Sequence, residues 1–78
     1  MQPIADSRSL GLLIRTERKA QQLTQEQLAG LTGVGVRFVR ELEAGKESCQ
    51  LGRALRVATA LGLNIYADSR REARRRYS

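Results

Sequence analysis

Histidine is absent from this sequence of 78 residues, and cysteine occurs only once. An internal disulfide needs two cysteines, and the common zinc sites need a set of cysteines and histidines, so neither can stabilise this chain. Cys49 has no histidine to activate it as a nucleophile, and we interpret it as an inert residue. A single core of this size is only marginally stable, which leaves association with a second copy as the expected support.

Long apolar runs are missing as well. The longest reach about five residues, whereas a membrane-spanning helix needs roughly 20. Met1 is not followed by a signal-peptide pattern. We therefore expect a cytoplasmic protein that has no membrane partner.

The residue sets that support catalysis are not found either. The sequence shows no paired acids on one helical face, no glycine loop that suits a phosphate and no set of metal ligands. The Gly33-x-Gly35 spacing is too short for a nucleotide-binding fingerprint. We expect no enzymatic activity, no cofactor, no metal site and no small-molecule substrate.

Acidic residues are in the minority, because 14 lysines and arginines face 8 aspartates and glutamates, which gives a net charge of +6. Such an excess favours a polyanionic partner, since clustered cations attract phosphate and release its counterions. Residues 1–67 and residues 68–78 each carry a net charge of +3, so half of the excess lies in the C-terminal tail. Because the tail is almost wholly charged, we expect it to be flexible or a frayed helix.

One compact domain is predicted over residues 8–67, between a loose lead-in at residues 1–7 and the tail. Apolar residues three and four positions apart predict a first helix from residue 8 to about 21. Ser7 or Ser9 could cap it. The apolar face of this helix comprises Leu10, Leu13 and Ile14.

A second, short helix is predicted to start after Thr24. The Thr24 hydroxyl can accept from the Gln27 amide while the Gln27 side chain reaches back, which is a capping box. Gly33 can supply the left-handed conformation that ends a helix. Since Gly35 follows at once, the turn is tight and suits the angled crossing of a helix-turn-helix, with Val34 packed beneath it. The apolar face of the second helix comprises Leu28, Ala29 and Leu31.

A third helix is predicted over residues 36–44, with Val39 and Leu42 facing the core and a glycine closing it. A fourth helix is predicted over residues 51–61, because apolar residues recur there at helical spacing until Gly62 stops the helix. The apolar stripe of the fourth helix comprises Leu51, Ala54, Leu55, Val57, Ala58 and Leu61.

Residues 63–67 alternate apolar and polar side chains, which is a strand signal. The chain offers no second strand, so the simplest partner is the same segment of a second copy. We therefore predict a homodimer in which Leu63, Ile65 and Tyr66 meet their counterparts across a two-fold axis. The alternative is that Leu63 and Ile65 fold back as a loop onto the core.

Polar residues around the predicted turn suit DNA recognition, which needs helix N-terminal amides for phosphate and base-reading side chains at the start of a second helix. Gln25 offers free backbone amides and a side-chain donor to a phosphate oxygen. Arg37, near the start of the third helix, can donate to O6 and N7 of guanine. Arg40 can contact a base or a phosphate, and Lys46 is placed for a phosphate.

Two apolar residues extend this surface. Val36 could pack on a thymine methyl group. Phe38 either touches sugar, methyl groups or a dimer partner, or packs in the core. Taken singly, each basic residue here is more often solvated surface, and Gln25 also fits a bare helix cap. The combination is what indicates DNA binding.

An ordered pattern of 16 positions runs through these helices and comprises Leu23-Thr24-Gln25-x-x-Leu28-Ala29, Gly33-Val34-Gly35, Val39, Glu43-x-Gly45-Lys46 and Ala60-Leu61-Gly62-Leu63. From about Leu10 to Leu63 the chain resembles the Xre family of lambda-repressor-like helix-turn-helix proteins. The resemblance implies an all-α bundle of four to five helices with a short C-terminal β-strand. It also implies a repressor that binds a palindromic operator in double-stranded DNA as a dimer.

The resemblance assigns roles to three further residues. Gly35 stands where the family usually has a serine that caps the third helix and contacts phosphate, so here only the backbone cap is kept. The family often pairs an arginine of the first helix with the glutamate of the E-x-G motif, which implies a structural ion pair between Arg18 and Glu43.

Within the family, the short length and the Leu-Gly-Leu followed by a strand are most similar to HipB-type antitoxins of toxin-antitoxin operons. That likeness implies repression of the chain's own promoter and a HipA-like kinase toxin as partner, with the tail as an extension for either. One alternative is a stand-alone Xre-type transcriptional regulator. Another is a protein-interaction adaptor that kept the fold without DNA binding.

Overall fold

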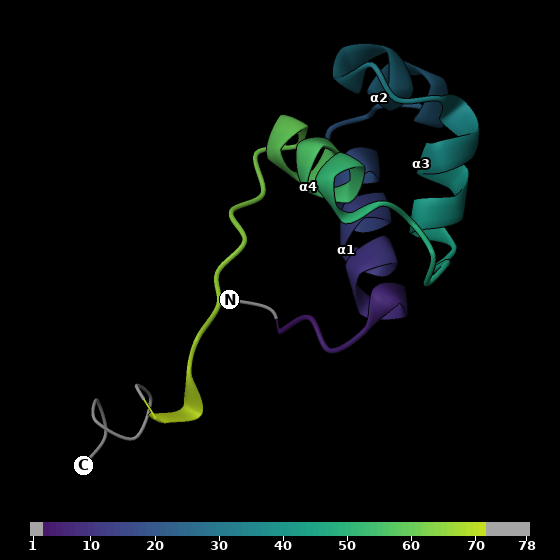
Figure 1. Cartoon of the computed structure of the whole chain (residues 1–78). Helices are drawn as coiled ribbons and strands as arrows, with labels where there is room; N and C mark the ends of the chain where they lie inside the picture. Colours follow the sequence, from purple (N-terminus) through teal and green to yellow (C-terminus); the bar gives the residue numbers. More distant parts are fainter. Residues whose placement is uncertain (1–2, 72–78) are drawn as a thin grey trace.

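Four helices build the fold within residues 3–71, which are the residues that the computed structural model describes, and residues 70–71 are helical as well (Figure 1). They are α1 (Ser7–Ala20), α2 (Gln25–Thr32), α3 (Val36–Glu43) and α4 (Leu51–Ala60). Helix α3 packs against both α1 and α2, and α4 packs against α2. The predicted all-α helix-turn-helix bundle is therefore confirmed.

The N-terminus of α1 is capped by a residue that the sequence analysis did not select. The Asp6 carboxylate accepts from the Ser9 amide at 2.8 Å, and the Ser9 hydroxyl accepts from the Asp6 amide at 3.1 Å. Ser9 is thus the third residue of a capping box, and Ser7 is the first helical residue. The prediction of a serine cap was wrong, because a carboxylate is the stronger acceptor at the positive end of a helix dipole. The hydrogen bonds from Ser9 lower the pKa of Asp6.

The predicted ends of α2 are confirmed. The Gln27 amide donates to the Thr24 hydroxyl at 3.0 Å, and the Thr24 amide donates to the Gln27 side chain at 2.8 Å. Gly33 ends the helix in the left-handed region with φ 75°. Helix α3 begins three residues after Gly33, at Val36, so a short turn joins the two helices, and Val34 is buried beneath this turn.

The core lies where the four helices meet. Its fully buried large side chains come one from each helix: Ile14, Leu28, Val39 and Val57. Around them lie Ala29, Val34, Leu42, Ala54, Ala58 and Leu61.

Three leucines that were predicted to be in the core are exposed instead. Leu31, Leu51 and Leu55 are 67%, 68% and 40% exposed. They lie at the edges of their helical stripes, and the neighbouring helices cover only the centres. The periodicity of apolar residues identified the correct helices, but it overestimated how much of each apolar face is buried.

Gly11 marks the closest approach of α1 and α3. A Cβ atom added there would lie 2.8 Å from the Glu43 carbonyl oxygen and would also clash with the carbonyl oxygen of Leu42. The missing side chain therefore lets the C-terminal turn of α3 lie directly on α1. This close packing offsets the cost of a glycine inside a helix, which is about 1 kcal/mol relative to alanine.

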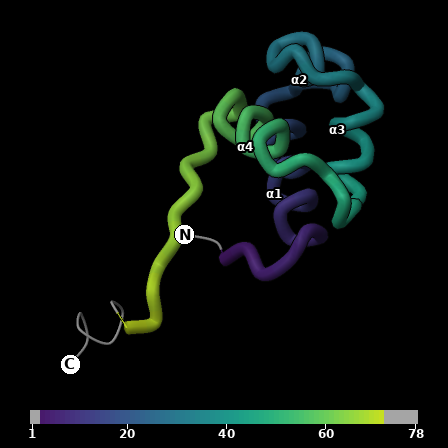
Figure 2. Tube along the Cα trace, viewed as in Figure 1, coloured from purple at the N-terminus to yellow at the C-terminus, as the bar shows by residue number. Residues whose placement is uncertain are grey.

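The segment after α4 runs away from the helices as extended chain (Figures 1 and 2). Residues 63–67 form no strand within the single chain, and the pairing partner predicted for them is the same segment of a second copy. A strand needs a second edge to donate and accept hydrogen bonds, and residues 3–71 provide none. Leu63 is half-buried against the core, whereas Ile65 and Tyr66 are 45% and 71% exposed.

The tail prediction lies mostly outside the described residues, because the structure describes residues 68–71 of it and not residues 72–78. Among the described residues, no helix is long and apolar enough to cross a membrane.

Candidate nucleic-acid interface

An ion pair between Arg18 of α1 and Glu43 of α3 lies at the base of the site. Arg18 Nε donates to Glu43 Oε2 at 2.7 Å, and Nη2 donates to Oε1 at 2.9 Å. The two side chains are only 10% and 4% exposed. The hydrogen bond to Glu43 raises the pKa of Arg18 further above its ordinary value. The structural pair that the family resemblance implied is thus confirmed.

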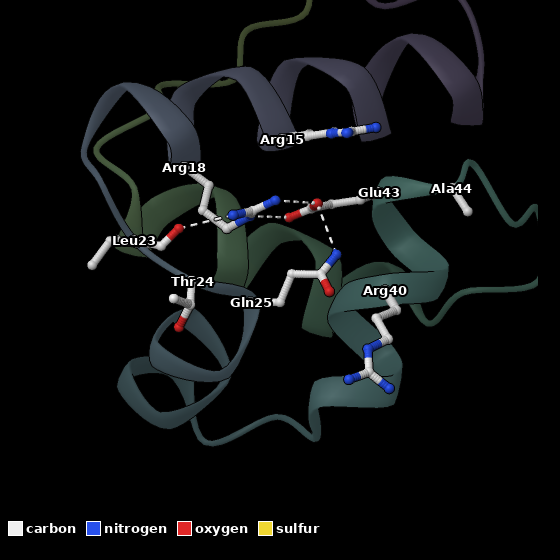
Figure 3. Close-up of a pocket in the computed structure, with 8 residues that line it drawn as sticks. All are labelled: Arg15, Arg18, Leu23, Thr24, Gln25, Arg40, Glu43 and Ala44. Atoms are coloured by element: carbon white, nitrogen blue, oxygen red, sulfur yellow. Dashed lines mark hydrogen bonds and ion pairs between the residues drawn. The ribbon is translucent and has the colours of Figure 1, made fainter.

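The same pair holds the start of α2. Arg18 Nη1 donates to the Leu23 carbonyl at 2.8 Å, just before the Thr24 cap. Gln25 Nε2 donates to Glu43 Oε1 at 3.1 Å. Arg18 and Glu43 therefore connect α1, the N-terminus of α2 and the end of α3 in one network (Figure 3).

The position of Gln25 is compatible with a phosphate contact. It is the first residue of α2, where backbone amides have no helical partner. A carboxamide nitrogen carries two hydrogens, and the bond to Glu43 uses one of them. The second hydrogen and the helix amides are the donors that an oxygen of a DNA phosphate would meet.

Above the ion pair lies an open groove of about 520 Å³ between α1, α2 and α3. In Figure 3, Arg15 of α1 and Arg40 of α3 lie on opposite sides of Glu43. The groove is lined by Arg15, Arg18, Leu23, Thr24, Gln25, Arg40, Glu43 and Ala44. Arg15 was not predicted from the sequence, although it precedes Arg18 by three residues and so lies next to it on the helix, at the exposed edge of the buried face.

Helix α3 has one buried face and one basic face. Val39 and Leu42 are buried, while the side chains of Arg37 and Arg40 are 89% and 60% exposed. Arg37 Nε lies 3.1 Å from Glu41, one turn along α3, and Arg40 Nη2 lies 3.4 Å from Glu26 of α2. Both contacts are surface ion pairs, which contribute little stability.

Lys46, just after α3, lies close to the same carboxylate as Arg37. Its Nζ is 3.0 Å from Glu41 Oε2. The hydrogen bonds from Lys46 and from Arg37 lower the pKa of Glu41. Arg37 and Lys46 therefore both contact the Glu41 carboxylate. This cluster is separate from the groove that Gln25 and Arg40 line.

The remaining predicted residues occupy different environments. Val36 and Phe38 are half-buried and pack against the core, so Phe38 makes the core contact that was its alternative. Gly35 is exposed and is the N-cap of α3, with no side-chain hydrogen bond. The segment with Ile65 and Tyr66 lies apart from the groove.

Cys49 is half-buried, and burial raises the pKa of its thiol, which keeps it in the less reactive protonated form. Within residues 3–71, no three histidine, cysteine, aspartate or glutamate side chains are placed to hold a metal ion.

The arrangement of α2, the turn and α3 is that of a helix-turn-helix DNA-binding protein. The helix-turn-helix family model matches residues 14–66, and the chain therefore belongs to this family, as a transcriptional regulator of the Xre type. The chain is 50% identical over 56 residues to the uncharacterized HTH-type transcriptional regulator y4mF of Sinorhizobium fredii (strain NBRC 101917 / NGR234). This match covers 72% of the present chain and 74% of the relative.

Solved structures of HipB share the fold. The chain matches HipB in the HipB-O4 20mer complex with a TM-score of 0.81 and 18% identity, over 90% of this chain and 99% of that one. It matches the HipA-HipB-O2-O3 complex with a TM-score of 0.82, again at 18% identity and over 90% and 99% of the two chains. At this identity the likeness concerns the fold.

Proposed function

We propose that this regulator is a sequence-specific repressor that binds an operator in double-stranded DNA as a homodimer. The observation that carries the proposal is the outer face of α3. Val39 and Leu42 anchor the helix in the core, and the side chain of Arg37 is 89% exposed one residue after the helix begins. A helix held in this way can enter the major groove with its N-terminal side chains against the base edges.

Arg37 is the proposed base reader. Its guanidinium can donate to O6 and N7 of guanine at once, which discriminates against other bases by about 1–3 kcal/mol. In the free protein it contacts Glu41 in an exposed pair, so its release to a base costs little. Arg40 is the proposed second contact, to a base or a phosphate. Val36 lies at the edge of the core, where it could pack on a thymine methyl group.

Phosphate contacts would fix the position of α3 in the groove. We assign them to the backbone and side chain of Gln25, to the backbone at Gly35 and to Lys46, with Phe38 against the sugar edge beside its core contact. These residues lie at both ends of α3 and at the start of α2. Such contacts position a protein on the duplex and leave the reading of sequence to the base contacts.

Dimerisation is assigned to the segment after α4. Ile65 and Tyr66 are exposed on extended chain that leaves the bundle, and Leu63 anchors the segment to the core. Pairing with the same segment of a second copy would satisfy its backbone groups and cover both side chains.

We further propose that the chain is a non-catalytic, cytoplasmic antitoxin that represses its own promoter and binds a HipA-like kinase toxin. The support is the fold likeness to HipB, which extends over 97–99% of those chains and so includes the region after α4. The second candidate is a stand-alone regulator, which is favoured by the 50% identical relative whose name mentions transcription regulation and no toxin.

Binding to the chain's own upstream region tests DNA recognition. Fluorescence anisotropy should show tight binding to that duplex, and Arg37→Ala should weaken it by about 5- to 150-fold, as expected for a lost bidentate base contact. Arg53→Ala removes another exposed arginine, from α4, and should leave the affinity within about twofold. Unchanged binding by the Arg37 variant would remove that residue from the interface.

Co-purification with the product of the adjacent reading frame separates the two candidates. A kinase-like protein that co-elutes with the chain and is inhibited by it supports the antitoxin. If no such gene neighbours this one, or if its product does not bind, the stand-alone regulator is the correct reading.

A further inference from the structure

The helix-turn-helix segment has no net charge with which to attract DNA. Residues 24–46 contain three basic and three acidic residues. Each of the three cations lies next to a carboxylate: Arg37 and Lys46 contact Glu41, and Arg40 contacts Glu26. Long-range attraction of a polyanion must therefore come from another part of the molecule.

Helix α1 carries a row of three exposed cations that we call the α1 stripe: Arg8, Arg15 and Lys19. They are spaced by seven and four residues, so they lie on one face of the helix. All three are exposed, and none forms a hydrogen bond or an ion pair through its side chain with another described residue. The buried face of α1 holds Gly11, Ile14 and Arg18 instead.

Two contacts place the α1 stripe beside the proposed DNA-binding surface. Arg15 lines the same groove as Gln25 and Arg40. Arg8 lies against Gly45, where an added Cβ atom would be 2.9 Å from the Arg8 Cα atom, and Gly45 directly precedes Lys46. The α1 stripe thus runs past the start of α2 and the end of α3, where the phosphate contacts are proposed.

We infer that the α1 stripe binds the DNA phosphate backbone beside the base-reading helix, and that it supplies much of the salt-dependent affinity of the folded domain. The inference rests on the proposed function and adds residues outside the helix-turn-helix segment to the interface. Charge complementarity selects the partner, because three unpaired cations in a row match a line of phosphates. No residue of the stripe reads sequence, so these residues position the protein on the duplex.

Helix α4 offers a matched control. Arg53 and Arg56 are also exposed and also lack a partner among the described residues, but neither lines the groove. Replacing Arg8 and Arg15 by glutamine therefore changes the net charge as much as replacing Arg53 and Arg56. Only position on the molecule differs between the two double variants.

The experiment measures the dissociation constant of the full chain by anisotropy between 50 and 200 mM salt, on the upstream-region duplex and on a mixed-sequence duplex. R8Q/R15Q should reduce the slope of log K against log salt by about 1.8 on both duplexes, since each phosphate contact contributes about 0.9. The salt-induced loss of affinity should then be about 12-fold smaller than in the wild type over this range. K19Q should reduce the slope by a further 0.9 or so.

R53Q/R56Q should leave the slope unchanged to within about 0.4, which is half of one phosphate contact. Thermal melts followed by circular dichroism confirm that each variant is folded. An equal reduction in both double variants, or no reduction in R8Q/R15Q, would overturn the inference while leaving the proposed function intact. Failure of the wild type to bind either duplex would overturn both.

Discussion

Breaking the buried pair between Arg18 and Glu43 should destabilise the domain strongly. The variant Arg18→Met removes one partner and leaves the Glu43 carboxylate, only 4% exposed, with the Gln25 side chain as its one remaining hydrogen-bond donor within residues 3–71. Breaking a buried pair by removing one partner costs about 3–5 kcal/mol, because the other charge stays buried without compensation. The Leu23 carbonyl loses its donor as well, which places the expected loss at the upper end of this range.

A loss of this size is a large share of the total, since a chain of this length has an unfolding free energy of about 4–12 kcal/mol. Urea unfolding followed by circular dichroism at 222 nm, at one fixed protein concentration, measures it. The double variant Arg18→Met/Glu43→Leu removes both charges and should regain most of the lost stability, because a well-packed apolar pair often matches a buried ion pair.

Two outcomes would refute this reasoning. A loss below about 1 kcal/mol for Arg18→Met would mean that the pair behaves as a solvated surface pair. Strict additivity of the two single changes in the double variant would mean that the charges are not coupled.

Three further predictions concern local features. Gly11→Ala should lower the unfolding free energy by about 1–3 kcal/mol despite its better helix propensity, because the new methyl group meets the backbone of α3; a stabilised variant in urea unfolding would contradict the close approach. Thr24→Ala should cost about 1 kcal/mol in the same assay, and Thr24→Ser should cost less because it keeps the cap, so equal losses would exclude the capping box. Glu41 has a lowered pKa, so its pairs contribute stability that is fully present above the unfolded pKa of about 4.5 and is lost as the pH falls below it. The urea midpoint of Glu41→Gln should consequently fall less than that of the wild type between pH 7 and pH 3, and parallel curves would show that the pairs do not form in solution.

The caps of α2 and the helical periods could be predicted from the amino-acid sequence. The capping box at Thr24, the left-handed glycine at 33 and the helical periods depend on contacts between residues at most four positions apart. The buried faces of α1 and α3 followed from the same periods, since Ile14 and Val39 lie at the centres of their stripes.

Contacts between helices could be predicted from the sequence only in part. The Arg18–Glu43 pair joins residues 25 positions apart and was expected only from the family resemblance. Arg15 was missed because its role depends on the groove between α1, α2 and α3, which forms only when these helices pack together. Leu51 and Leu55 were placed in the core because periodicity reports the direction of a side chain around its own helix and not the area that a neighbour covers.

Sequence alone thus determined the four helices, both ends of α2, the buried side of α3 and the excess of positive charge. Tertiary structure decided which apolar residues are covered, which cations are paired and which, on α1, remain free beside the groove. The physical reason is range: caps and periods are satisfied within one or two turns of chain, whereas burial and ion pairing depend on how faces from distant segments meet.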